Sequence, residues 1–203
     1  RSCSSAASDV YKRQPQYFES YHDEMEYLVE HKGRNNLIKN LVNDLKGNTL
    51  VLFNYVEKHG EPLYELINNT IDPERKLFFV HGGTDVEDRE EVRQITETES
   101  NAIIVASYGT FSTGINIKRL HNILFASPSK SRIRNLQSIG RVLRKGEGKD
   151  IATLYDIADD IGGQNYTLKH LNERVNIYND ENFKYEVINC LLYTSDAADE
   201  QDR

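Results

Sequence analysis

A predicted helix in the C-terminal half of the sequence places an amide and two guanidinium groups on one face. In the stretch QSIGRVLRKG, Gln137, Arg141 and Arg144 are spaced four and three residues apart, and residues at these spacings are neighbours on a helix surface. A guanidinium group presents a rigid fork of N–H donors that matches the oxygens of a phosphate or a carboxylate. Since the whole chain carries a formal net charge of −7, this local pattern indicates a binding surface for an anion.

The basic character extends over the surrounding segment, residues 118–149. Its only acidic residue is Glu147, against nine basic residues: Lys118, Arg119, Lys130, Arg132, Arg134, Arg141, Arg144, Lys145 and Lys149. A local concentration of positive charge is typical of a protein that binds a polyanion. The alternative is a solvated basic helix balanced by the acidic stretch at residues 85–99. We favour the polyanion because the basic residues adjoin further candidate phosphate ligands.

One such candidate is the stretch HGGTDVEDRE, residues 81–90. Gly82 and Gly83 allow the backbone to turn and to approach a ligand closely. Thr84 with Glu87 predicts a capping box that starts a helix at about Asp85, and the free amides of a helix start suit a phosphate group. Taken alone, an ordinary turn between a strand and a helix explains the same residues more simply.

A second candidate is the stretch SYGTFSTGINI, residues 107–117. Small hydroxylated residues and exposed amides suit phosphate oxygens, and the stretch offers Ser107, Gly109, Thr110, Ser112, Thr113 and Gly114. It is not a Walker A loop, because no Gly-Lys-Ser/Thr sequence follows. A polar loop with no ligand is an equally good interpretation of this stretch by itself.

Other titratable residues give weaker signals. Asp156, Asp159 and Asp160 lie close together in LYDIADDIG; they could form a metal site, but a solvated strand end is the preferred interpretation. The histidines at positions 22, 31, 59, 121 and 170 show no metal-ligand spacing. No spacing supports a pair of nucleophile and base.

The elements that must position these residues alternate between strands and helices. Continuous apolar runs indicate strands covered on both faces, and alternation with helices predicts an α/β fold with a mainly parallel sheet. The predicted strands are 49–54, 76–80, 102–107, 121–127 and 151–157, and the predicted helices are 35–45, 58–69, 85–96, 131–145 and 166–182. Ligand sites in such sheets lie beyond the carboxyl ends of the strands. The residues expected there are 54–55, 81–84, 107–116 and 127–129.

The two ends of the chain resemble translated DNA rather than protein structure. Back-translation of SSAASDVYKRQ, residues 4–14, gives a DNA tag whose reverse complement translates as CLLYTSDAADE, residues 190–200. We therefore interpret residues 1–14 and 190–203 as translated adaptor sequence and exclude them from fold reasoning. The native segment is then expected to be a piece of a longer protein.

Cysteine usage and hydropathy exclude several classes of protein. Cys3 and Cys190 both fall in the predicted adaptor sequence, so the native segment holds neither a disulfide scaffold nor a zinc–thiolate site. It contains no signal peptide and no apolar run long enough to span a membrane. We expect a cytoplasmic protein.

Three segments in this order resemble the second RecA-like domain of superfamily 2 helicases. TLVLFNYVEKHG, ASYGTFSTGINI and QSIGRVLR are similar to motifs IV, V and VI of that family. IATLYDIADD and YNDENFKYEV further resemble the recombination helicases of T4-type bacteriophages, and the resemblance covers nearly all of residues 15–189. It implies a RecA-like three-layer sandwich over residues 15–165 with a short C-terminal extension over residues 166–189.

The resemblance also implies a role for each motif residue. Arg141 and Arg144 would reach the γ-phosphate of ATP on the other RecA-like domain, with Arg144 as the arginine finger, and Gln137 would order that interface. Gly114 and Asn116 would border the nucleotide, although many family members have Asp at the latter position. The implied contacts to the DNA backbone are Asn54, Tyr55, His81, Gly82, Ser107, Thr110, Lys130 and Arg132.

The native segment has no GxxxxGK[ST] loop and no acidic box after a buried strand. The resemblance therefore implies that ATP and Mg²⁺ are held mainly by a first RecA-like domain outside this segment. The parent would be an ATP-dependent enzyme acting on branched or duplex DNA, or on an RNA–DNA hybrid, in recombination and repair, and the segment alone would be inactive. A non-catalytic nucleic-acid-binding module with the same fold is the alternative.

Overall fold

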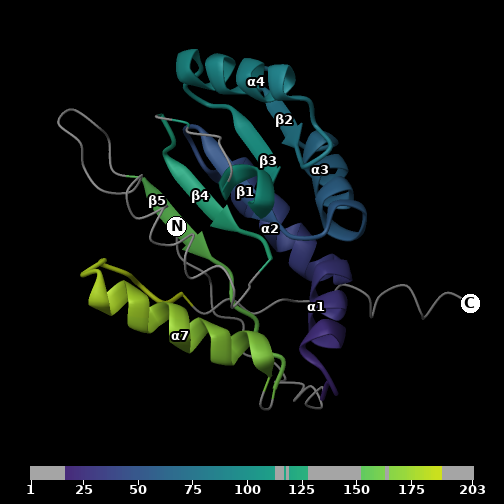
Figure 1. The fold of residues 1–203 in the computed structure, drawn as a ribbon, viewed down its shortest axis with the longest axis vertical. Coiled ribbons are helices and arrows are strands. Elements are labelled where there is room, and N and C mark those ends of the chain that lie inside the picture. Colours follow the sequence, from purple (N-terminus) through teal and green to yellow (C-terminus); the bar gives the residue numbers. More distant parts are fainter. Residues whose placement is uncertain (1–16, 113–116, 118, 128–151, 163–164, 189–203) are drawn as a thin grey trace, which may run out of the picture.

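A five-stranded, wholly parallel sheet forms the centre of the molecule, in the order β2-β3-β1-β4-β5. The computed structural model describes residues 17–112, 117, 119–127, 152–162 and 165–188 (Figure 1). The strands are β1 (Thr49–Phe53), β2 (Leu77–Val80), β3 (Ile103–Ser107), β4 (Asn122–Phe125) and β5 (Thr153–Asp156). The predicted α/β class with a parallel sheet is confirmed.

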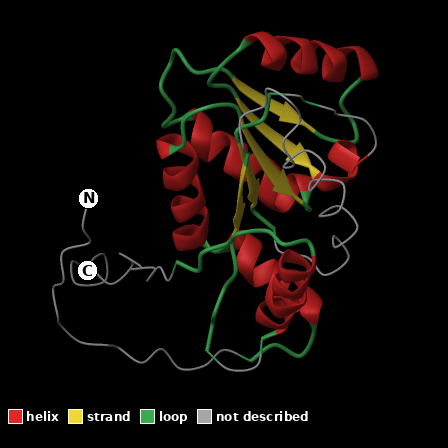
Figure 2. Cartoon of the chain, turned by 90° about the vertical axis from the view of Figure 1, so that its left-hand side faces the viewer, coloured by secondary structure: helices red, strands yellow, loops and turns green. Residues whose placement is uncertain are grey.

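Helices cover both faces of this sheet, which makes three layers (Figure 2). The described helices are α1 (Tyr21–Glu30), α2 (Lys32–Asp44), the π-helical turn η1 (Val56–Gly60), α3 (Glu61–Asn68), α4 (Val86–Thr98), α5 (Tyr108–Ser112) and α7 (Tyr166–Asp180). α2 and α3 contribute buried residues to the core on one face, while α7 and α4 pack against the other.

Alternation along β1 explains how one apolar run supplies both cores. Its five residues are all buried, and successive side chains of a strand point to opposite faces. Val51 and Phe53 pack on the side of α2 and α3, whereas Leu50 and Leu52 pack on the side of α7. The continuous apolar pattern therefore did indicate a strand covered on both faces.

The predicted helix over residues 58–69 differs in its first turn. The chain forms η1 and then α3, and the amides of His59 and Gly60 both donate to the carbonyl of Tyr55, at 3.2 and 2.8 Å. A Cβ at Gly60 would lie 2.5 Å from the ring of Phe53. The absence of a side chain at this position lets the turn pack directly against the end of β1.

The N-terminal helix α1 is absent from the sequence prediction. Ser20 caps it by accepting from the amide of Asp23 at 3.2 Å, so the cap was readable from the sequence. The buried face of the helix includes the carboxylate of Glu24 beside Met25 and Leu28, and a buried charge weakens the apolar period that predicts a helix. The lead-in helix predicted from residue 35 begins at Lys32.

The predicted capping box before α4 is wrong. The cap residue is Asp85, with no side-chain hydrogen bond to the helix, and the helix begins at Val86. The hydroxyl of Thr84 instead accepts from the amide of His81 at 3.0 Å. Thr84 closes the turn that precedes the helix.

The predicted solvated strand end after β5 is also wrong for its first two carboxylates. Asp156 accepts from Arg174 Nε and from the hydroxyl of Tyr178, both at 2.7 Å. Both carboxylate oxygens of Asp159 accept from Arg34 Nε at 2.9 Å. Both arginines are buried, at 1% and 2% exposure, and a buried cation requires such a partner. Asp160 is exposed.

The C-terminal helix α7 belongs to the packed core. Tyr178 is a buried member of the cluster that contains Leu52 and Ile104, and Val175 and Ile177 pack against that cluster. Its N-terminus lies against α1, whose Glu24 carboxylate accepts from the amides of Tyr166 and Thr167 at 2.6 and 2.7 Å.

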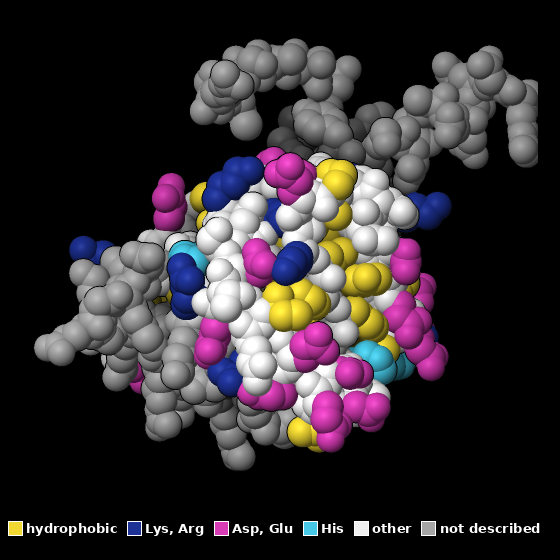
Figure 3. Space-filling view, turned by 90° about the horizontal axis from the view of Figure 1, so that it is seen from above, with side chains coloured by type: hydrophobic (Ala, Val, Ile, Leu, Met, Phe, Trp, Pro, Cys, Tyr) yellow, Lys and Arg dark blue, Asp and Glu magenta, His cyan; other side chains and the backbone are white. Residues whose placement is uncertain are grey.

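The surface on the side of α4 is rich in Asp and Glu, with Lys and Arg scattered among them (Figure 3). On α4 itself, Arg93 forms salt bridges with Glu90 and Glu97 at 2.5 and 2.6 Å. The bonds from Arg93, and then from Gln94, lower the pKa of Glu90 to about 2. In the part of the chain that the structure describes, no helix combines the length and the hydropathy needed to cross a membrane.

Candidate nucleic-acid interface

The parallel register brings the predicted contact residues to one edge of the sheet. Ser107 stands opposite Phe53, and Val80 stands opposite Ala106. Asn54 and His81 directly follow β1 and β2, and Ser127 lies two residues beyond β4. The chain runs from β1 to β2, returns to β3 and then crosses β1 to reach β4. This crossing is the topological switch point at which open α/β sheets bind ligands.

The residues after β3 form a short helix, α5, rather than the predicted loop. The hydroxyls of Ser107 and Thr110 lie 2.8 Å apart, and the amide of Thr110 donates to the Ser107 hydroxyl at 3.3 Å. Both side chains are buried, at 8% and 3% exposure. Gly109 is exposed, and a Cβ there would meet nothing within 4 Å. The hydroxyls therefore shape the turn, and Gly109 presents its outer surface.

Two side chains hold the turn after β2, one from the turn itself and one from α4. His81 Nδ1 accepts from the amide of Gly83 at 3.2 Å. Arg89 Nε donates to the carbonyl of Thr84 at 2.8 Å, and its Nη2 donates to the carbonyl of Gly82 at 3.2 Å. Gly82 is exposed with open space around it. Sequence reasoning did not identify Arg89, although it lies one turn into the predicted helix.

The ends of β1 and β4 are joined directly. The amide of Asn54 donates to Ser127 Oγ at 3.3 Å, and the hydroxyl of Tyr108 donates to the carbonyl of Ser127 at 3.1 Å. Tyr55 follows with its carbonyl bonded to η1 and its side chain half-buried. Of the predicted contacts, the described ones lie at or just beyond the carboxyl ends of β1, β2 and β3, which pair in the order β2-β3-β1. They are Asn54, Tyr55, His81, Gly82, Ser107 and Thr110.

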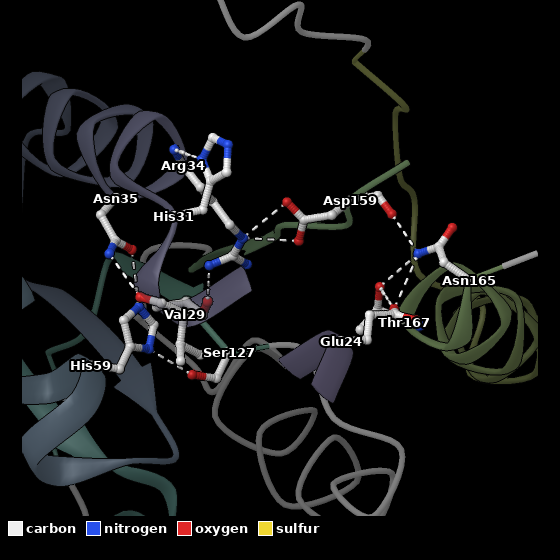
Figure 4. Close-up of polar contacts among 11 residues, drawn as sticks. Glu24, Val29, His31, Arg34, Asn35, His59, Ser127, Asp159, Asn165 and Thr167 are labelled. Carbon is white, nitrogen blue, oxygen red and sulfur yellow. Dashed lines mark hydrogen bonds and ion pairs between the residues drawn. The ribbon is translucent and has the colours of Figure 1, made fainter. Parts of the chain in front are cut away.

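A buried polar cluster that the sequence did not predict lies behind this edge (Figure 4). Arg34 Nη1 donates to the carbonyl of Ala126 at 2.7 Å, and His59 Nδ1 lies 2.8 Å from Ser127 Oγ. Burial, followed by the nearby charge of Arg34, lowers the pKa of His59 to about 3. The imidazole is therefore neutral at physiological pH.

Several predicted site residues lie outside the described part of the chain. They are the three motif VI residues Gln137, Arg141 and Arg144, together with Gly114, Asn116, Lys130 and Arg132. Of the predicted basic segment, Arg119 is described: it is exposed and its Nη1 donates to the carbonyl of Glu97 at 3.2 Å. Within the described ranges, no three His, Asp or Glu side chains are grouped in a way that would hold a metal ion.

The fold and the sequence together define a helicase domain. Residues 33–146 match the family described as the helicase conserved C-terminal domain, and the chain belongs to this family. Over 200 residues the chain is 36% identical to the protein named ATP-dependent DNA helicase uvsW of Enterobacteria phage T4. This alignment covers 88% of the chain and 39% of the phage protein. The chain therefore spans about two fifths of the length of that relative.

Solved structures agree with this family. The crystal structure of T4 UvsW superposes with a TM-score of 0.68 at 37% identity, covering 80% of this chain and 35% of that one. The yeast DEAD-box splicing factor Prp28 shares the fold, with a TM-score of 0.54 at 18% identity over 79% of this chain and 36% of its own. The predicted resemblance to the second RecA-like domain of superfamily 2 helicases, and to a phage recombination helicase, is confirmed.

Proposed function

We propose that this chain is the C-terminal motor domain of an ATP-dependent DNA helicase or translocase that remodels branched DNA or R-loops in phage recombination and repair. The observation that carries the proposal is the 36% identity, over 88% of the chain, to a protein named as an ATP-dependent DNA helicase. The activity would take place in the cytoplasm of the host cell.

The carboxyl edge of the sheet would follow the sugar–phosphate backbone. Phosphate oxygens accept hydrogen bonds from backbone amides and from hydroxyl and amide side chains. The exposed turns at Gly82 and Gly109 allow a backbone to approach without a side chain in the way. Contacts of this kind carry little sequence information, which suits an enzyme that moves along DNA of any sequence.

ATP and Mg²⁺ would be held mainly by a first RecA-like domain. ATP binding would close the two domains, and hydrolysis would reopen them. The carboxylates of Asp156 and Asp159 are bonded to buried arginines, so these two side chains do not offer a metal site. The contribution of this chain would be the charge of Arg144, with Arg141 and Gln137 beside it. A guanidinium group in this role stabilises the charge on the transferring phosphoryl group.

The test is a chimera in which residues 15–189 replace the aligned segment of the full-length phage T4 relative. We expect the chimera to hydrolyse ATP in the presence of DNA, and Arg144→Ala to lower that rate by about 10³-fold. DNA affinity should stay within about twofold of the value without the substitution. Arg144 is assigned to ATP, so all the proposed contacts to the DNA phosphates remain. Arg93→Ala, which breaks salt bridges on α4, is the control and should leave the rate unchanged.

A different outcome would favour the alternative function. If the chimera hydrolysed no ATP while the chain still bound DNA, or if Arg144→Ala weakened DNA binding and spared hydrolysis, a non-catalytic nucleic-acid-binding module would be the better description. The unfused chain is expected to hydrolyse no ATP with or without DNA.

A further inference from the structure

A buried line of hydrogen bonds connects the ends of two central strands to the N-terminal helices. Figure 4 shows the part of this line from Ser127 to Val29. The amide of Asn54 donates to Ser127 Oγ at 3.3 Å, and this oxygen lies 2.8 Å from His59 Nδ1. His59 Nε2 lies 3.2 Å from Asn35 Oδ1, and Asn35 Nδ2 donates to the carbonyl of Val29 at 2.8 Å. The line thus joins the residues after β1 and β4 to η1, α2 and α1.

The Val29 end of the line fixes the direction of every bond in it, and the Asn54 end is compatible with that direction. The amide of Asn54 can only donate, and the carbonyl of Val29 can only accept. The amide nitrogen of Asn35 must therefore face the carbonyl, which leaves its oxygen to accept from His59. His59 then carries its proton on Nε2, and its bare Nδ1 accepts from the hydroxyl of Ser127. A single tautomer satisfies all four contacts.

The surroundings hold this imidazole neutral and in place. His59 and Ser127 are both fully buried. The nearby cation, Arg34, is itself bonded to Asp159 and to the carbonyl of Ala126, the residue before Ser127. A second proton on His59 would be a second buried positive charge beside Arg34, and it would remove the acceptor that Ser127 uses.

The backbone around His59 leaves it little room to shift. The His59 amide donates to the carbonyl of Tyr55 at 3.2 Å, so the same residue is attached to the end of β1 through its main chain and to the end of β4 through its ring. The next residue, Gly60, lies against the ring of Phe53 without space for a Cβ. Movement of the imidazole would therefore displace both strand ends together.

We propose that His59 is a positioning residue for the nucleic-acid interface: its neutral, single-tautomer imidazole fixes the spacing between the end of β1 at Asn54 and the end of β4 at Ser127. It acts through these two residues and does not itself touch the nucleic acid, because it is buried. This inference rests on the proposed DNA-binding function of the same edge. It adds a residue behind the edge on which the geometry of the edge depends.

The test measures the affinity of the full 203-residue chain for a labelled duplex oligonucleotide at one fixed salt concentration. His59→Phe keeps a ring but removes both nitrogens, and Ser127→Ala removes the hydroxyl in the middle of the line. Each variant should raise the Kd for the duplex by about tenfold. Displacement of the strand ends should cost the equivalent of one well-placed hydrogen bond between the edge and the DNA. The double variant should bind the duplex no more weakly than either single variant. The effects of substitutions on the Kd are not additive when the two residues act as one unit.

Two controls separate positioning from stability. His59→Gln supplies an acceptor and a donor on one amide and should restore the Kd to within about threefold of the wild-type value. Val42→Ala removes core volume from α2 on the same side of the sheet. It should lower the free energy of unfolding and leave the Kd of the folded protein unchanged.

The outcomes distinguish this role from the proposed function. Failure of the wild-type chain to bind the duplex would refute DNA binding by this edge, and the role of His59 with it. Binding by the wild type, with an unchanged Kd in folded Ser127→Ala, would refute the role of His59 alone. Equal weakening by Val42→Ala would also overturn it. Nitrogen NMR of the histidine ring in the free chain must report the Nε2–H tautomer.

Discussion

At the scale of single residues, buried polar side chains organise the edge of the sheet. Arg34 and His59 are fully or almost fully buried, and both reach the segment that follows β4. Their partners are distant in sequence: Arg34 and Asp159 are separated by 125 positions. Such pairs are invisible to periodicity, which compares only neighbours along one element.

The depressed pKa of His59 predicts a pH dependence of stability. Burial, then the charge of Arg34, lowers the pKa from 6.5 to about 3. Between these values the unfolded chain binds a proton that the folded chain does not, so stability falls as the pH falls below 6.5. From pH 7 to pH 5 the wild type should lose about 2 kcal/mol more of its free energy of unfolding than His59→Gln does.

Urea denaturation of both proteins at the two pH values measures this difference. Val42→Ala, which removes core volume without removing a titratable group, supplies the control and should keep the pH dependence of the wild type. Parallel losses in the wild type and in His59→Gln would mean that His59 is protonated in the folded chain.

At the scale of elements, the strands were predicted to within two residues at every end, because each contains consecutive apolar side chains, and β1, β3 and β4 are buried along their whole length. The elements that were misjudged contain buried charges or close packing that a pattern does not record. α1 buries the carboxylate of Glu24, and η1 depends on the contact between Gly60 and Phe53. The residues at the carboxyl edge of the sheet could be predicted from the strands that precede them. Arg89 and the buried polar cluster behind this edge could be identified only from the fold.

One buried carboxylate of α1 bonds to the N-terminus of α7, beside ring contacts of Tyr21 with Tyr166 and His170. Glu24 accepts from the amides of Tyr166 and Thr167, from the hydroxyl of Thr167 and from the side chain of Asn165, at 2.6 to 3.2 Å. A carboxylate at a helix N-terminus satisfies amides that have no partner within the helix. Glu24→Gln replaces one acceptor oxygen with an N–H₂ donor that faces donors. It should lower the free energy of unfolding by about 2–3 kcal/mol.

Glu26 supplies the matched control on the same helix. Its carboxylate pairs with Lys58 at the surface, and exposed pairs of this kind contribute about 0–1 kcal/mol. Chemical denaturation of the two variants beside the wild type makes the comparison. A loss in Glu24→Gln no larger than that in Glu26→Gln would show that the buried carboxylate does not hold α7.

At the scale of the whole molecule, α7 packs against the core of the sheet. The sequence suggested that the RecA-like unit ends at residue 165 and that residues 166–189 form an extension. In the fold, α7 packs Val175, Ile177 and Tyr178 against the same cluster as the central strands. It also carries Arg174, which is bonded to the end of β5. These contacts make α7 part of the layer that covers one face of the sheet.

Truncation tests where the folding unit ends. Removing residues 166–203 would expose the apolar face formed by Leu52, Ile104 and Phe125 and leave Asp156 without its arginine. Burial of each large apolar side chain contributes about 1.5–3 kcal/mol, and whole domains are stable by only about 5–15 kcal/mol. We therefore expect the chain ending at residue 165 to lose its cooperative unfolding transition.

The chain cut to residues 15–189 should unfold at the same urea concentration as the full chain, because the residues removed are predicted to be adaptor-encoded. Cooperative unfolding of the shorter chain would instead place the boundary of the domain before α7.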